Sequence, residues 1–263
     1  MHATRPAAVS GSFYPADAAV LQQEVDQLLD QPSTTTAGRP TALVVPHAGY
    51  QYSGAIAAAA FRQLRPWCDD IDRVVLIGPA HRVPLVGAAL SAAGYFHTPL
   101  GDVVVDSRET QALEKLSGFA VRDDAHAHEH CLEVQLPFLQ TLLGDFRLVP
   151  VVVGQASSQV LRPLLERYWG APHTLIVLST DLSHYLTRDQ AEHLDQRTCA
   201  AIEALDGERI GEEQACGRYP LRALLDVARH HHAHVQTLAM GTSADSGGDL
   251  QRVVGYGAWL LSA

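Results

Sequence analysis

Short runs of β-branched and aliphatic residues recur along the chain, and each run is closed by glycine, proline or a polar turn. Runs of this kind are typical of strands that are buried on both faces. The clearest examples are residues 42–45, 74–77, 147–153 and 174–178. Because the segment 54–65 between the first two is rich in strong helix formers, the pattern predicts a strand–helix–strand unit.

The remaining segments extend the same alternation. Apolar positions at helical spacing predict a first helix over 18–29, followed by a polar connector over 31–40. The other expected helices cover 107–116, 132–143, 157–169 and most of 188–232, and the other short strands cover 88–95, 102–105, 235–239 and 253–261. We therefore expect an α/β fold, a single domain over residues 1–263 whose central sheet is mixed, largely parallel and flanked by helices.

Composition narrows the class of protein. Hydrophobic residues make up 47% of the 263 residues and charged residues 18%, as in a globular chain. A net charge of −10 argues against nucleic acid or an anionic membrane surface as the main partner. No apolar stretch reaches the roughly 18 residues of a transmembrane helix, and the first residues do not read as a signal peptide. The four cysteines form no C-x-x-C pair, so we expect a cytoplasmic protein with reduced thiols.

Histidines follow two of the predicted strands. His47 lies just after the strand 42–45, and His81 lies just after the strand 74–77. Asp181 and His184 follow the strand 174–178 in the same way. Open α/β sheets form their ligand crevices at the carboxyl ends of parallel strands. Converging imidazole and carboxylate groups there predict a metal site, although each histidine could also cap its strand without a metal.

Two further histidine clusters lie in segments 125–131 and 229–234. In the segment 125–131, an extended backbone would place His126, His128 and His130 on one face. These three imidazoles could bind metal, or form a solvated edge; we favour His130 as an acid–base group in the pocket, with the others structural. The segment 229–234 reads as the exposed end of a helix, where cationic side chains complement the helix dipole.

Two glycine-containing loops could also contribute to a site. Residues 49–54 open the helix after His47, and Tyr50 or Tyr52 could donate a hydrogen bond to a substrate or could pack in the core. Residues 243–249 form a polar loop before the last strand, where a carboxylate could complete a metal site or an ordinary turn could form.

Ordered motifs spanning nearly the whole chain resemble the Memo family, called AmmeMemoRadiSam system protein B in prokaryotes. The matching segments are Ala8-Val9-Ser10-Gly11-Ser12-Phe13-Tyr14-Pro15, Pro46-His47-Ala48-Gly49-Tyr50, Gly78-Pro79-Ala80-His81, Thr98-Pro99-Leu100-Gly101, Glu129-His130-Cys131-Leu132-Glu133-Val134-Gln135-Leu136-Pro137-Phe138, Ser179-Thr180-Asp181-Leu182-Ser183-His184-Tyr185 and Val253-Val254-Gly255-Tyr256.

The Memo family in turn resembles the class III (LigB-type) extradiol dioxygenases, which use non-haem Fe(II). The resemblance implies that His47 and His81 bind the metal and that Asp181 and His184 are pocket residues. In the animal relative the third ligand is a cysteine, and spacing back from Tyr256 places that position near Ser246. Since serine is a poor metal ligand, we expect His184, Asp245 or Asp249 to complete the site.

These observations predict a metal-dependent, redox or dioxygenase-like enzyme that acts on a small oxygenated substrate. The expected cofactor is a divalent metal, Fe(II) first, with copper or zinc as alternatives. His130 and His184 are the candidate catalytic proton-transfer groups, and Asp181 is the candidate catalytic group that orients an imidazole. A non-catalytic metal- or peptide-binding protein is the alternative, and the resemblance implies a radical-SAM enzyme and an AMMECR-type protein as partners. Metal-assisted hydrolysis of an amide or ester is a third possibility.

Overall fold

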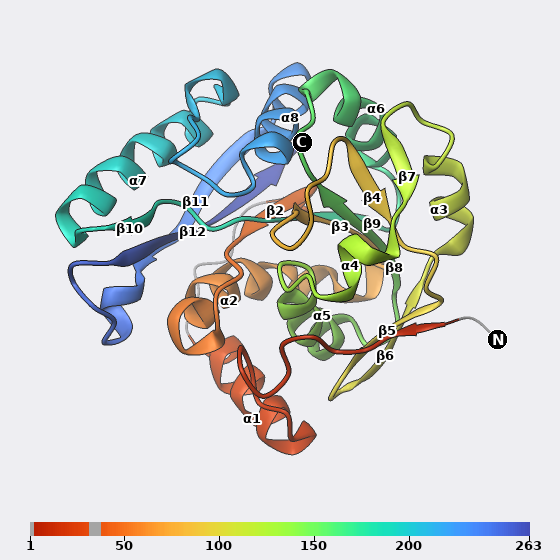
Figure 1. The fold of residues 1–263 in the computed structure, drawn as a ribbon, viewed down its shortest axis with the longest axis horizontal. Helices are drawn as coiled ribbons and strands as arrows, with labels where there is room; N and C mark the ends of the chain where they lie inside the picture. Colours follow the sequence, from red (N-terminus) through yellow and green to blue (C-terminus); the bar gives the residue numbers. More distant parts are fainter. Residues whose placement is uncertain (1–2, 32–37) are drawn as a thin grey trace.

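The structure, a computed structural model, describes residues 3–31 and 38–263, so most of the polar connector expected over 31–40 lies outside the described residues. A twelve-stranded mixed sheet runs through the molecule, and helices cover both of its faces (Figure 1). The neighbouring strands follow the order β1-β5-β6-β8-β3-β9-β2-β12-β10, with β11 beside β12 and β4 between β7 and β8. This arrangement confirms the predicted α/β class.

The strands are β1 (Thr4–Arg5), β2 (Ala42–Val45), β3 (Arg73–Pro79), β4 (Ala88–Leu90), β5 (Tyr95–Thr98), β6 (Gly101–Val105), β7 (Phe119–Val121), β8 (Arg147–Val153), β9 (Thr174–Ser179), β10 (His184–Leu186), β11 (His234–Thr242) and β12 (Val253–Ser262). The five central strands β6, β8, β3, β9 and β2 are mutually parallel. Antiparallel pairs lie mainly toward the margins, as between β12 and β2. The carboxyl ends of the central strands therefore share one edge.

The α-helices are α1 (Ala18–Leu29), α2 (Ala55–Phe61), α3 (Ser107–Leu113), α4 (Asp123–Ala127), α5 (Leu136–Leu143), α6 (Ser158–Tyr168), α7 (Arg188–Glu203) and α8 (Arg218–His230). Alternate residues of each central strand point to opposite faces of the sheet. Leu43 of β2 belongs to the core cluster that includes residues of α1, α2 and α5, whereas Val44 belongs to the cluster on the other face, which includes residues of α3, α6 and α8. Both faces are therefore covered, which explains why these strands are continuously apolar.

Several local predictions were wrong. The strand expected over 88–95 is divided, because β4 ends at Leu90 and β5 begins at Tyr95. The segment 54–65 is one helix in the prediction, but in the structure a π-helical turn, η1 (Tyr50–Gly54), precedes α2, and a 3₁₀ segment, η2 (Arg62–Asp70), follows it. The segment 125–131 is not extended, because α4 covers its beginning. Acidic residues at the start of α4 complement the helix dipole and favour the helical turn.

Other expectations are confirmed closely. The first helix begins and ends at the predicted residues, and the Asp106 side chain caps α3 by accepting a hydrogen bond from the Glu109 backbone N–H. Pro137 lies in the first turn of α5, where it costs no backbone hydrogen bond. Within the described residues, no helix has the length and apolar character needed to cross a membrane.

Candidate metal centre

Three neighbouring parallel strands deliver polar side chains to one place. The sheet order β3-β9-β2 puts the carboxyl ends of these strands side by side. The second residue after each strand is His81 after β3, Asp181 after β9 and His47 after β2. The side chains of His47 and Asp181 are almost fully buried. The predicted convergence at the strand ends is therefore present, with the ring centroids of His47 and His81 only 5.1 Å apart.

Hydrogen bonds fix which nitrogen of His47 faces the cluster. The Ser179 hydroxyl donates to the Cys131 carbonyl at 2.7 Å and accepts from Gln135 Nε2 at 2.9 Å. With its single proton used, Ser179 Oγ must also accept from His47 Nδ1, which lies 2.9 Å away. The Nε2 atom of His47 is therefore left with a free lone pair. Asp181 adds a second constraint, because its Oδ1 accepts from the His47 backbone N–H at 2.7 Å.

Glu129 does the same for His81. Its Oε2 accepts from the His81 backbone N–H at 2.6 Å, and its Oε1 lies 2.9 Å from His81 Nδ1. Glu129 is 2% exposed, so this carboxylate is paired in a water-poor environment. A carboxylate that holds one imidazole nitrogen directs the other nitrogen toward a metal, which is the usual support for a histidine ligand.

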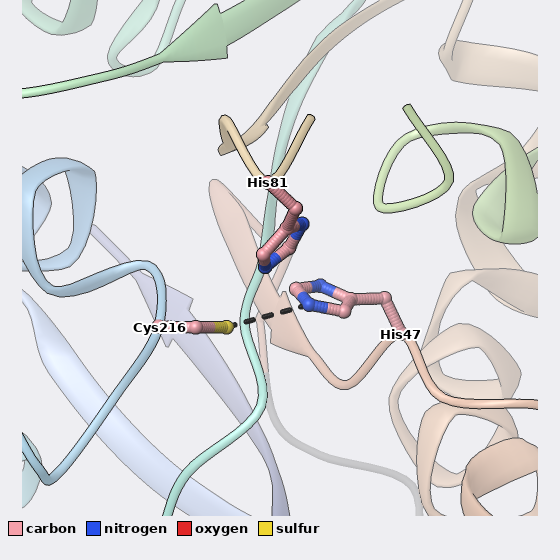
Figure 2. A group of neighbouring side chains, drawn as sticks. All are labelled: His47, His81 and Cys216. Atoms are coloured by element: carbon pink, nitrogen blue, oxygen red, sulfur yellow. Dashed lines mark hydrogen bonds between the residues drawn. The ribbon is translucent and has the colours of Figure 1, made fainter. Parts of the chain in front are cut away.

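Cys216 supplies the third donor of the cluster, from the loop before α8. Its Sγ lies 3.3 Å from His47 Nε2 and accepts from the Asp181 backbone N–H at 3.3 Å (Figure 2). Donor atoms of His47, His81 and Cys216 all lie within 4.8 Å of one another. The loop can approach because residue 217 is glycine: a Cβ there would lie 2.8 Å from Thr180 Cβ.

The two imidazoles have opposite electrostatic properties. Burial, together with the nearby His81 and His130, holds the pKa of His47 well below its ordinary value of 6.5. Burial would also lower the pKa of His81, but hydrogen bonds to Cys216 and Glu129 outweigh it and raise that pKa to about 10. Without a metal, therefore, His47 is neutral and His81 is protonated, with its Nδ1 facing Glu129.

A second group of possible ligands, His81, Glu129 and His130, lies beside the first. The Glu129 carboxylate already accepts backbone N–H groups of His81, His130 and Cys131, at 2.6, 2.9 and 3.2 Å. Together with His81 Nδ1 at 2.9 Å, these donors occupy the lone pairs of the carboxylate and present positive dipoles where a cation would lie. We therefore assign Glu129 to the support of the imidazoles and not to a second metal.

His130 lies where the sequence placed it, in the pocket. Its ring stacks on that of His81 at 4.8 Å and contacts the ring of Phe13 at 4.9 Å. The Nδ1 atom is 3.1 Å from Glu129 Oε1 but makes no well-aligned hydrogen bond. The other histidines of that segment lie elsewhere. His126 is buried and bonded to the Ala89 carbonyl, with its pKa lowered to about 4 mainly by burial, and His128 is exposed.

The cluster opens into a cavity of about 980 Å³. Asp181, His184 and Tyr52 line this cavity, as their predicted roles require. Tyr50 does not, because its ring packs at 4.9 Å from that of Phe138 in the core and its hydroxyl donates to the Val134 carbonyl. The role predicted for Tyr50 in contacting a substrate therefore does not fit the structure, whereas the core alternative does.

The described residues offer a different third donor from the ones expected, since Cys216 groups with His47 and His81. Asp245 accepts from the Thr242 backbone N–H and pairs with Arg188 at 2.7 Å, so its carboxylate is held by other groups. Neither His184 nor the loop around Ser246 joins the two histidines in a ligand group among the described residues. The prediction counted back from Tyr256 and so looked for the third donor near Ser246. Cys216 lies much earlier in the chain, before both α8 and β11.

Sequence reasoning also missed Glu129 and Ser179 as supports of the imidazoles. Glu129 adjoins the predicted His130, and Ser179 directly follows the predicted strand 174–178, so the sequence placed both residues near the expected site. Their partners lie 48 and 132 residues away along the chain, however, and only the folded sheet brings them together.

Comparison with known proteins gives the class of this chain. Residues 5–260 match the family model described as Memo-like protein, and the chain belongs to that family. It is 36% identical to a MEMO1 family protein of Methanopyrus kandleri, over 97% of each chain. It is 31% identical to the memo-1 homolog of Caenorhabditis elegans, over 88% of this chain and 74% of that one. An uncharacterized protein from Escherichia coli K12 shares the fold, with a TM-score of 0.55 at 12% identity over 84% of this chain and 99% of the other.

Proposed function

We propose that this Memo-family protein is a metal-dependent, dioxygenase-like redox enzyme whose metal is held by His47, His81 and Cys216. The observation that carries the proposal is the oriented donor set: two imidazoles, each held through Nδ1, and a thiol 3.3 Å from His47 Nε2. Two nitrogens and one sulfur suit Fe(II), copper or zinc, and the thiolate favours the softer ions more than a carboxylate would. A bound divalent metal would supply an open position for O₂ or for a substrate oxygen.

The residues around the donor set have separate tasks in this proposal. Ser179 and Glu129 hold the two imidazoles, and Asp181 fixes the backbone of His47. His130, stacked on His81, is the group placed to accept or return a proton of the substrate, and His184 lines the same cavity. Tyr52 lines it too and is placed to donate its hydroxyl proton to a substrate oxygen. The partnership with a radical-SAM enzyme and an AMMECR-type protein remains part of the proposal.

The test is the metal content of tag-free protein purified without oxygen. We expect stoichiometric metal in the wild type and in Cys68→Ser, a partly exposed cysteine outside the cluster. Cys216→Ser and the double variant His47→Ala/His81→Ala should lose it. Metal that persists in the double variant would contradict the proposal and would direct attention to the exposed histidines after α8.

Activity is tested separately. Consumption of O₂ by the iron- or copper-loaded protein with a panel of oxygenated small molecules distinguishes an oxidative reaction from hydrolysis. Turnover of amide or ester substrates without O₂ consumption would replace the dioxygenase-like proposal with metal-assisted hydrolysis at the same residues.

A further inference from the structure

The mouth of the cavity carries an exposed aromatic side chain on a strained backbone. Tyr185 is the middle residue of β10, and the register with β12 shifts across it, from His184 opposite Val254 to Leu186 opposite Val253. Its φ is 60°, a left-handed conformation that is uncommon for a bulky residue. Bulges of this kind re-aim side chains beside functional sites. Here the bulge leaves Tyr185 lining the cavity and 63% exposed.

A guanidinium group lies over this ring. The Cζ atom of Arg252 is 4.9 Å from the ring centroid of Tyr185. Among the described residues, no carboxylate lies within ion-pair distance of Arg252 or of Arg82, which lines the cavity directly after His81. A stacked arginine is suited to bidentate pairing with a planar carboxylate.

The remaining lining of the cavity defines the size and charge of a ligand. Phe13 and Tyr52 add aromatic surface to that of Tyr185. Four carboxylates also line the cavity and would repel a polyanion: Asp181, Glu212, which pairs with Arg218, Glu213 and Asp249. The combination favours a ligand with one negative charge and a flat apolar body.

We propose that this mouth recognises a singly charged carboxylate carried on an aromatic ring, and that the substrate belongs to this chemical class. The carboxylate pairs with Arg252 on the face of Tyr185, and Arg82 adds positive potential beside the donor set. The assignment of this ligand as the substrate rests on the proposed function, whereas its binding does not.

Benzoate is the probe, titrated calorimetrically into metal-free and zinc-loaded protein, with benzamide as the neutral isostere. We expect saturable binding of benzoate, at least about tenfold weaker binding of benzamide, and a similar loss in Arg252→Gln, because a charge-assisted hydrogen bond is removed. Tyr185→Gly should also weaken binding while keeping the fold, since glycine adopts this φ readily. Arg65→Gln, an exposed arginine paired with Asp30 far along the chain, is the matched control and should bind as wild type does.

Equal binding of benzoate and benzamide, or an Arg252→Gln variant as tight as wild type, would overturn the proposal. So would the absence of saturable benzoate binding in both forms of the protein. Metal affinity measured on the same samples separates the two ideas. If the protein binds benzoate through Arg252 but binds no metal, the anion site stands and the proposed function fails. If the protein binds metal but shows no binding of benzoate through Arg252, only the anion site fails.

Discussion

Replacing Glu129 by glutamine changes one atom at the support of the donor set and tests whether the carboxylate orients His81. Glu129 is 2% exposed and accepts the backbone N–H groups of His81, His130 and Cys131, with His81 Nδ1 as a further partner. Burial alone would raise its pKa, but the adjacent His130 ring and the hydrogen bonds from His81 hold that pKa far below the ordinary 4.5. The site is therefore built for the ionised carboxylate.

The magnitude follows from these contacts. In Glu129→Gln one oxygen becomes an NH₂ group, which must face N–H donors on at least one side. Each buried donor left without an acceptor costs about 1–3 kcal/mol, so we expect a loss of about 2–5 kcal/mol in the free energy of unfolding. Loss of a carboxylate behind a ligating imidazole lowers metal affinity by about 10- to 100-fold.

Urea unfolding of metal-free protein measures the first effect, and competition with a chromophoric chelator measures the second. The sign of the pH dependence gives an internal check. Because the pKa of Glu129 is lowered on folding, its contribution is present above the ordinary value of 4.5 and is lost as the pH falls below it. The difference in the free energy of unfolding between wild type and Glu129→Gln should therefore become smaller as the pH falls below 4.5. A variant with wild-type stability and metal affinity at pH 7 would refute the orienting role.

Four further outcomes are expected. Zinc binding at pH 7.5 should release about one proton or more, because the pKa of His81 is about 10 without metal; calorimetry in buffers of different ionisation enthalpy measures this, and binding without proton release would contradict it. Because the pKa of His81 is raised on folding, its protonated form stabilises the metal-free protein fully below pH 6.5. This stabilisation should disappear as the pH rises through about 10. Burial raises the pKa of Asp195 from 3.8 to about 6, so the free energy of unfolding of the wild type should fall as the pH rises through that range. Asp195→Asn should not show this fall, and its amide can still bond Ser183. Chemical unfolding at several pH values tests the prediction. Gly255→Ala should cost about 3 kcal/mol or more in thermal unfolding, because its Cβ would lie 1.7 Å from Asp195 Oδ2, and a wild-type melting temperature would exclude this close approach.

The sequence by itself determined the central sheet and two of the three members of the donor set. Continuous apolar runs such as Ala42–Val45 can only be buried on both faces, which requires helices on both sides and parallel neighbours. Once the strands are parallel, residues that follow them meet at one edge, so His47, His81 and Asp181 could be placed together without coordinates.

The tertiary structure alone decided what completes the site. Cys216 is 169 residues from His47 along the chain, and its approach depends on a loop packed against Thr180, which no local periodicity encodes. The segment 123–127 just before His130 is helical, although alternation predicted an extended chain from residue 125, since acidic residues at a helix start outweigh a period-two pattern of only three histidines. Periodicity reports which face of an element is buried, but contacts between distant elements arise only when the elements pack.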